Sequence, residues 1–190
     1  PPNFPSTFPD LRPMTSTVPE SLARDLAALT LPDASRVWIY IANRAFTAEE
    51  RPVLEAHLAA FTSSWAAHGT PLAAEAAVLL DQVVVLAVDE APQTATGCSI
   101  DASVAALRAL PQAAPTLADL DLFDRSWVLY LTDATSPEWK CAKLHDFWAM
   151  RKAGTLTDAA VIFDSTVTQL GTLRSEGAKA FSDSWHAHMW

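Results

Sequence analysis

Three side chains of this sequence could form a nucleophilic centre. Cys98 stands in the segment TATGCSIDASV at the predicted start of a helix, where the positive end of the helix dipole stabilises a thiolate. His68 in WAAHGTP and Asp133 at the end of WVLYLTD are expected to reach the same end of a sheet. A cysteine, a histidine and an acid in that arrangement are typical of a thiol-dependent hydrolase or transferase.

A structural role accounts for the same residues. Gly97 and Cys98 are small enough for a tight turn before the helix, and Ser99 or Asp101 would cap its first turn. His68 would lie in the last turn of the preceding helix and bond free carbonyl groups there. We favour this interpretation, so no catalytic residue is assigned and the thiol-dependent enzyme is kept as the alternative.

Cofactor and metal sites are not indicated. The string GTLRSEGAK departs from a phosphate-binding loop, because it has one residue too many between the glycines and an alanine before the lysine. Five glycines in the whole chain also leave no dinucleotide fingerprint. His186 and His188 could both face one metal ion from an extended segment, but no third ligand has zinc spacing. We therefore expect neither a cofactor nor a metal.

The elements that would position these side chains alternate along the middle of the chain. Apolar runs rich in β-branched residues predict strands at 36–42, 71–80, 83–90 and 125–133. Helical spacing predicts one helix from the capping box of Thr47 and Glu50 to Gly69, and another that ends before Pro111. This β-α-β-β-α-β order is that of a ferredoxin-like α+β fold, an antiparallel sheet with two helices on one face.

Both ends of the chain extend this core. Residues 1–35 are predicted to form a proline-rich docking arm and a short helix, and residues 36–190 a single α+β domain. After the core, a helix is expected from Ser136 and Pro137 to Gly154, followed by a strand at 159–167. The chain then closes with the aromatic tail FSDSWHAHMW.

Composition excludes several classes of function. The net charge is −9 and the 13 Lys and Arg form no basic stripe, which argues against nucleic acid and against direct attachment to an anionic membrane. The longest apolar stretch is interrupted by Asp81 and Gln82, so no membrane insertion is expected. The beginning of the sequence lacks the pattern of a signal peptide, and only two cysteines are present. These features predict a cytoplasmic protein.

Five segments of the sequence resemble a family of small uncharacterised bacterial proteins of the Bacteroidetes type. They are VWIYIANRAFTAEE, WAAHGTPL, VDEAPQTATGCSIDASV, AGTLTDAAVIFDSTV and DSWHAHM, and the resemblance spans about residues 36–189. Members often carry the automatic label "ABC transporter ATPase", which we do not transfer because this sequence has no Walker motif. The resemblance implies no established activity. The matching positions are Asn43, Arg44, His68, Gly69, Asp89, Glu90, Gly97 to Asp101, and Ser184 to His186.

The two chain ends carry the functional hypothesis. Extended proline-rich segments lose little entropy on binding and can lie along a groove of a partner. We therefore expect a non-catalytic accessory subunit that docks on other protein subunits, with a respiratory or photosynthetic membrane complex, approached from its cytoplasmic face at the inner membrane, as the specific hypothesis. A small-ligand sensor is a third possibility that no particular residue supports. The expected partner-binding residues are Pro1, Pro2, Phe4, Pro5, Phe8, Pro9, Trp185 and Trp190.

Overall fold

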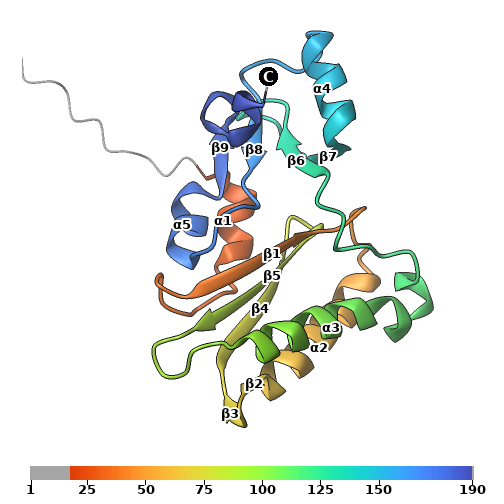
Figure 1. Ribbon diagram of the computed structural model, residues 1–190. Helices are drawn as coiled ribbons and strands as arrows, with labels where there is room; N and C mark the ends of the chain where they lie inside the picture. The colour runs from red at the N-terminus through yellow and green to blue at the C-terminus, as the bar shows by residue number, and fades with distance from the viewer. Residues whose placement is uncertain (1–17, 190) are drawn as a thin grey trace, which may run out of the picture.

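A computed structural model describes residues 18–189 of the chain (Figure 1). Within them the protein is α+β, with two main antiparallel sheets and a short hairpin. The first half of the described chain comprises α1 (Glu20–Leu26), β1 (Arg36–Ile41), α2 (Glu50–Ser64), β2 (Ala66–Ala67), β3 (Thr70–Pro71), β4 (Ala73–Leu79), β5 (Val83–Asp89) and α3 (Gly97–Ala113). The second half comprises β6 (Trp127–Leu131), β7 (Lys140–Lys143), α4 (Leu144–Lys152), β8 (Val161–Phe163), α5 (Leu170–Glu176) and β9 (Ala178–Ala180).

The first sheet has the strand order β1-β5-β4, with β5 in the centre. Helices α2 and α3 cover one face and α1 lies against the other (Figure 1). Each residue of β5 from Val83 to Val88 is fully buried, because its side chains point alternately into the core under α2 and α3 and into the core under α1. The strands predicted at 71–80 and 83–90 are confirmed as β4 and β5, which pair as a hairpin.

The second sheet has the order β7-β6-β8-β9 and lies beyond the β1 edge of the first (Figure 1). Its strand β6 contributes Leu129 to the core that also holds Ile41 of β1, while Val128 and Tyr130 face a third core under Phe147 of α4. Helix α1 packs in the core that joins the two sheets. This helix corresponds to the short helix predicted within residues 1–35.

A ferredoxin-like topology is not confirmed. The element order β-α-β-β-α-β is present, and three strands pair as that fold requires, but the fourth, β6, pairs with β7 and β8 in the second sheet. The edge of β1 is instead met at one end by the chain after β8. There the Val37 amide donates to the Thr168 carbonyl at 3.0 Å, and the Leu170 amide donates to the Ser35 carbonyl at 2.9 Å.

The end of α2 differs from the prediction. The capping box at its start is confirmed, because the Glu50 amide donates to the Thr47 hydroxyl at 3.2 Å and the Thr47 amide donates to the Glu50 carboxylate at 2.9 Å. The helix nevertheless ends at Ser64 and not at Gly69. His68 lies in the tight turn between β2 and β3 with a φ of 49°, so the prediction that it occupies the last turn of the helix was wrong.

Two further boundaries differ from the expected ones. Helix α3 begins at Gly97 and runs through Pro111 to Ala113, with Thr96 as its N-cap. The helix expected from Ser136 starts only at Leu144, since residues 140–143 pair with β6 as strand β7. Within residues 18–189, no helix has the length and hydropathy that crossing a lipid bilayer would require.

Candidate functional site

Of the three side chains of the nucleophilic hypothesis, Cys98 and His68 come from elements that contact each other, and Asp133 comes from the second sheet. Cys98 is exposed in the first turn of α3, and His68 is exposed in the β2–β3 turn below the first sheet. Asp133 follows β6, a strand of the second sheet, and that sheet lies on the opposite side of the first sheet from β2 and β3 (Figure 1). Its carboxylate accepts hydrogen bonds from the amide and hydroxyl of Thr135, which hold its pKa below the usual value. No hydrogen bond or ion pair links Asp133 to either of the other two in the described part of the chain.

The two cysteines should differ in reactivity because of burial. Burial raises the pKa of the Cys141 thiol to about 11, whereas Cys98 is exposed. We expect iodoacetamide at pH 7.5 to alkylate Cys98 well before Cys141 in the native chain, as peptide mass spectrometry would show. In Cys98→Ser the native protein should stay largely unlabelled until it is unfolded. Equal labelling of both cysteines in the native wild type would contradict the burial of Cys141.

The predicted docking residues of the arm, which are Pro1, Pro2, Phe4, Pro5, Phe8 and Pro9, lie outside the described residues, as does Trp190. Trp185 is described and its side chain is 41% exposed. Its ring stacks on that of His186, with the ring centroids 3.8 Å apart. The His186 ring is buried against Phe147 of α4. Trp185 is therefore held on the surface by a buried neighbour.

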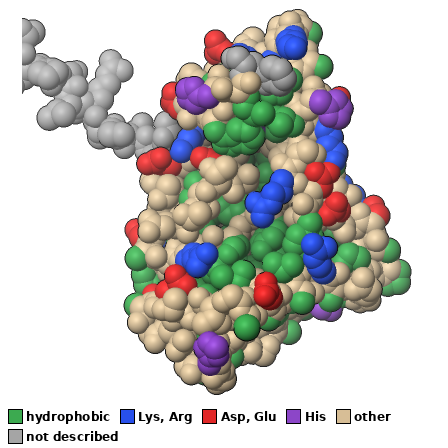
Figure 2. Space-filling view, viewed as in Figure 1, with side chains coloured by type: hydrophobic (Ala, Val, Ile, Leu, Met, Phe, Trp, Pro, Cys, Tyr) green, Lys and Arg blue, Asp and Glu red, His purple; other side chains and the backbone are tan. Residues whose placement is uncertain are grey.

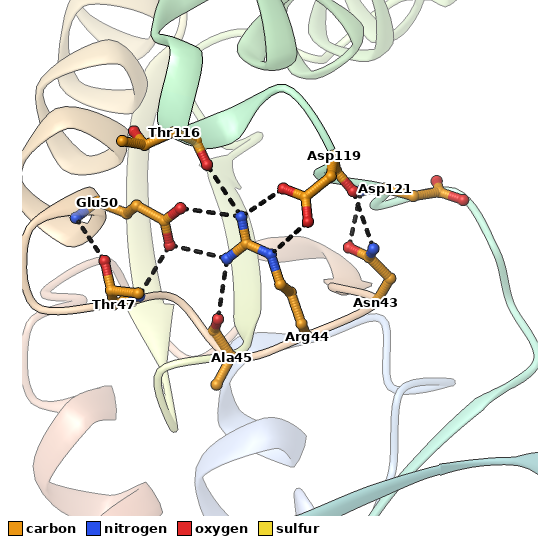
Figure 3. A network of polar contacts seen from close by, with 8 residues as sticks. All are labelled: Asn43, Arg44, Ala45, Thr47, Glu50, Thr116, Asp119 and Asp121. Atoms are coloured by element: carbon orange, nitrogen blue, oxygen red, sulfur yellow. Dashed lines mark hydrogen bonds and ion pairs between the residues drawn. The ribbon is translucent and has the colours of Figure 1, made fainter.

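Arg44 is the centre of a polar network between two loops (Figure 3). Its guanidinium donates to both oxygens of Glu50 at 2.8 and 2.9 Å, and to both oxygens of Asp119 at 2.6 and 3.0 Å. It also donates to the carbonyls of Ala45 and Thr116. The guanidinium lowers the pKa of both carboxyls and its own pKa is raised. Because every N–H donor of Arg44 is engaged in these bonds, no donor is left to bind a substrate. Its role is to join the chain segments that carry its acceptors.

This network fixes the segment that follows α3. Asn43 adds to it, since its side chain donates to the Asp119 carbonyl and accepts from the Asp121 amide, both at 2.9 Å (Figure 3). The Asn43 amide also donates to the Asp121 carbonyl at 2.9 Å. The loop after β1 is thereby tied to residues 116–121. The next residues, starting with Leu122, form one wall of a cleft.

The cleft, of about 530 Å³, lies between the two sheets along the outer edge of β1. Figure 2 shows hydrophobic side chains in a hollow between the upper and lower halves of the molecule, with Lys and Arg side chains around it. Residues 37–41 form its floor, and residues 165–168 form one side together with Trp185. Residues 122–125 and Trp127 form the other side.

The main chain of β1 is the most distinctive feature of this cleft. In an antiparallel ladder both backbone groups of a residue point to the same neighbour, and successive residues alternate. Val37 donates away from β5, to Thr168, while Ala42 donates to the Gln82 carbonyl that precedes β5. Ile39 and Ile41 lie two and four residues after Val37, so their backbone groups also point away from β5. Their N–H and C=O groups therefore face the cleft, and on that side they have no backbone partner among residues 18–189.

Sequence reasoning identified Trp185 but missed the cleft. Its floor and walls come from separate segments of the sequence, residues 37–41, 122–127 and 165–168, and the strand predicted at 125–133 pairs in the second sheet and not beside β1. Over the described part of the chain, no three His, Cys, Asp or Glu side chains come together as ligands for a metal ion.

No protein-family model, curated protein or solved structure matches this chain. The resemblance to the Bacteroidetes-type family accordingly stays a prediction.

Proposed function

We propose that the protein is a non-catalytic accessory subunit that binds an extended segment of another protein in the cleft. The bound segment would add a strand to the first sheet beside β1. The observation that carries this proposal is the pair of residues Ile39 and Ile41, whose main-chain groups face the cleft. Main-chain hydrogen bonds supply affinity in strand addition, and pockets for alternate side chains supply specificity.

The surroundings of β1 favour a single extended segment as the bound partner over the edge strand of another sheet. Val37 is already paired with Thr168 at one end of the strand, and Asn43 with Asp121 just beyond the other. An exposed sheet edge invites aggregation unless it is short or covered. Here the free part of the edge is short and recessed between two walls, so a single extended chain could reach it while the long edge of another sheet could not. This arrangement is suited to docking and protects against self-association.

The walls of the cleft supply side-chain contacts for such a segment. Trp38, Trp127 and Trp185 all line it, and aromatic side chains are enriched in protein interfaces because they bury a large area at low entropic cost. The larger assembly predicted from the sequence, a respiratory or photosynthetic membrane complex, remains our proposal for the partner. The additional docking role of the arm remains part of the same proposal.

Proline at position 39 tests strand addition directly. The Ile39 amide does not bond β5, so Ile39→Pro removes a donor that faces the cleft and leaves the ladder between β1 and β5 intact. Ile39→Ala is the matched control, because it shortens the same side chain and keeps the amide. We expect the tagged wild-type protein and Ile39→Ala to retain a partner when purified from the cells that make the protein, and Ile39→Pro to lose it.

Circular dichroism of both variants would establish that they are folded. Retention of the same partner by a folded Ile39→Pro variant, in the amount retained by Ile39→Ala, would show that the β1 edge is not the docking site.

A further inference from the structure

Two arginines beside the cleft lack a carboxylate partner. Arg125 lines the cleft, and the Arg108 guanidinium lies 4.2 Å from the centre of the Phe123 ring, which also lines it. Neither takes part in an ion pair with any residue from 18 to 189. The other arginines of that range all do, and they are Arg24, Arg36, Arg44, Arg51, Arg151 and Arg174. In a chain of net charge −9, one unpaired guanidinium in the cleft and a second against its Phe123 wall call for an explanation.

The carboxylate that lines the cleft does not balance these cations. Asp124 is paired with the Lys143 ammonium group and accepts hydrogen bonds from the amide and hydroxyl of Ser126. These contacts hold the pKa of Asp124 well below its usual range, so its charge is present and already neutralised by Lys143. Of the two charged residues that line the cleft, Asp124 is thus neutralised and Arg125 is not, so the lining carries a net positive charge on a protein that is acidic as a whole.

The cations lie on one face of the sheet at the edge of β1. Tyr40 packs in the core under α2 and α3, with its ring 5.7 Å from that of Phe123, and Arg125 is close enough to lower the pKa of its phenol, which burial raises. Ile39 packs on the opposite face, in the core under α1. Side chains of a strand added beside β1 would alternate between the same two faces. Every second side chain would meet the arginines, and the ones between would meet apolar surface.

We propose that the segment bound in the cleft is an extended chain in which acidic and apolar residues alternate. Its acidic side chains pair with Arg108 and Arg125, and its apolar side chains pack on the face of β1 that carries Ile39. This inference rests on the proposed function and specifies the chemistry of its partner. Complementary charge of this kind also speeds association and selects among partners.

Three capped peptides test the proposal with the full-length protein. They are acetyl-Glu-Val-Glu-Val-Glu-amide and its counterparts with lysine or threonine in place of glutamate, each titrated by calorimetry. We expect the glutamate peptide to bind at least about tenfold more tightly than the threonine peptide, and the lysine peptide to bind most weakly. The preference for glutamate should shrink as salt is raised from 0.05 to about 0.5 M.

Substitution of Arg108 and Arg125 tests whether these two arginines cause the preference for the glutamate peptide. Arg108→Gln combined with Arg125→Gln should weaken binding of the glutamate peptide about tenfold and leave the threonine peptide unchanged. Arg24→Gln, at an exposed arginine of α1, is the matched control and should change neither. Ile39→Pro should weaken all three peptides, because strand addition is common to them.

The outcomes separate the two proposals. Equal affinity for all three peptides, lost in Ile39→Pro, would overturn the acidic-segment inference and leave strand addition standing. Binding of none of them to the wild-type protein would count against both. A wild-type dimer that Ile39→Pro converts to a monomer in sedimentation analysis would assign the cleft to a second copy of the chain, and would also overturn the proposal.

Discussion

Replacing Arg44 with methionine should lower the free energy of unfolding by about 3 kcal/mol, because it leaves the Glu50 carboxylate buried without its cation. Glu50 is only 4% exposed, and Arg44 is the cation that pairs with it. Urea unfolding followed by tryptophan fluorescence would give the change by linear extrapolation. The same variant should loosen residues 116–121 and hence the wall of the cleft, since Arg44 holds Asp119 and Thr116.

Two further variants isolate the cost of the buried charge. Arg24→Met removes an arginine whose side chain is largely exposed, so it should change the free energy of unfolding by less than about 1 kcal/mol. Adding Glu50→Gln to Arg44→Met should recover part of the loss, because glutamine keeps the capping bond to Thr47 without a charge. If Arg44→Met were no more destabilising than Arg24→Met, the network would be a surface feature without structural importance.

Acid should destabilise the wild-type protein through His186. This ring is 3% exposed, its Nδ1 has no hydrogen-bond partner among the described residues, and burial lowers its pKa to about 4. The nearby Asp164 raises the pKa slightly, but that carboxylate is itself paired with Lys179. In the unfolded chain a histidine has a pKa of about 6.5. The unfolded state therefore binds a proton at pH 5 that the native state does not.

The direction of the pH dependence follows from these two values. The stability that depends on neutral His186 is complete above about pH 6.5, and is lost as the pH falls towards 4, at up to about 1.4 kcal/mol per pH unit. His186→Phe keeps an aromatic ring against Phe147 and should flatten this part of the curve of unfolding free energy against pH. His188→Phe, at an exposed position, should leave the curve unchanged. A wild-type curve that is flat between pH 6.5 and 5 would contradict the burial of a neutral His186.

Local structure was predictable where neighbouring residues determine it. The capping box of Thr47 and Glu50 forms as its spacing predicts, and the strand at the start of the core is confirmed as β1. The capping box depends on hydrogen bonds between residues three apart, and β1 is indicated by a local run of β-branched and aromatic residues although its ladder partner is the distant β5. The boundaries that failed depend on distant contacts. Residues 140–143 are strand because β6 lies beside them, and no pattern within those four residues indicates it.

The candidate site was beyond the reach of sequence patterns for the same reason. Arg44 and Asp119 are separated by 75 positions, and no sequence motif around either residue predicts that the two form an ion pair. The edge of β1 is open because β6 pairs with β7 and β8 in the other sheet. Which strands pair with each other depends on the whole fold, and no short sequence pattern determines it. Trp185 could be singled out from the sequence, since two of the seven tryptophans fall within residues 185–190. The cleft beside it required the three-dimensional arrangement.

The turn between β4 and β5 sets the register in which these two strands pair. Because side chains on both faces of β5 are buried and apolar, a shift by one residue would exchange one apolar set for another, and alternation alone does not select the register. The turn before it is well defined, since Leu80 and Asp81 both have positive φ and the Gln82 amide donates to the Leu79 carbonyl at 3.1 Å. Asp25 of α1 also accepts from the Leu80 amide at 2.7 Å. Correct alignment of β4 with β5, and with it the edge on which the cleft is built, thus depends on one short turn, residues 80–82.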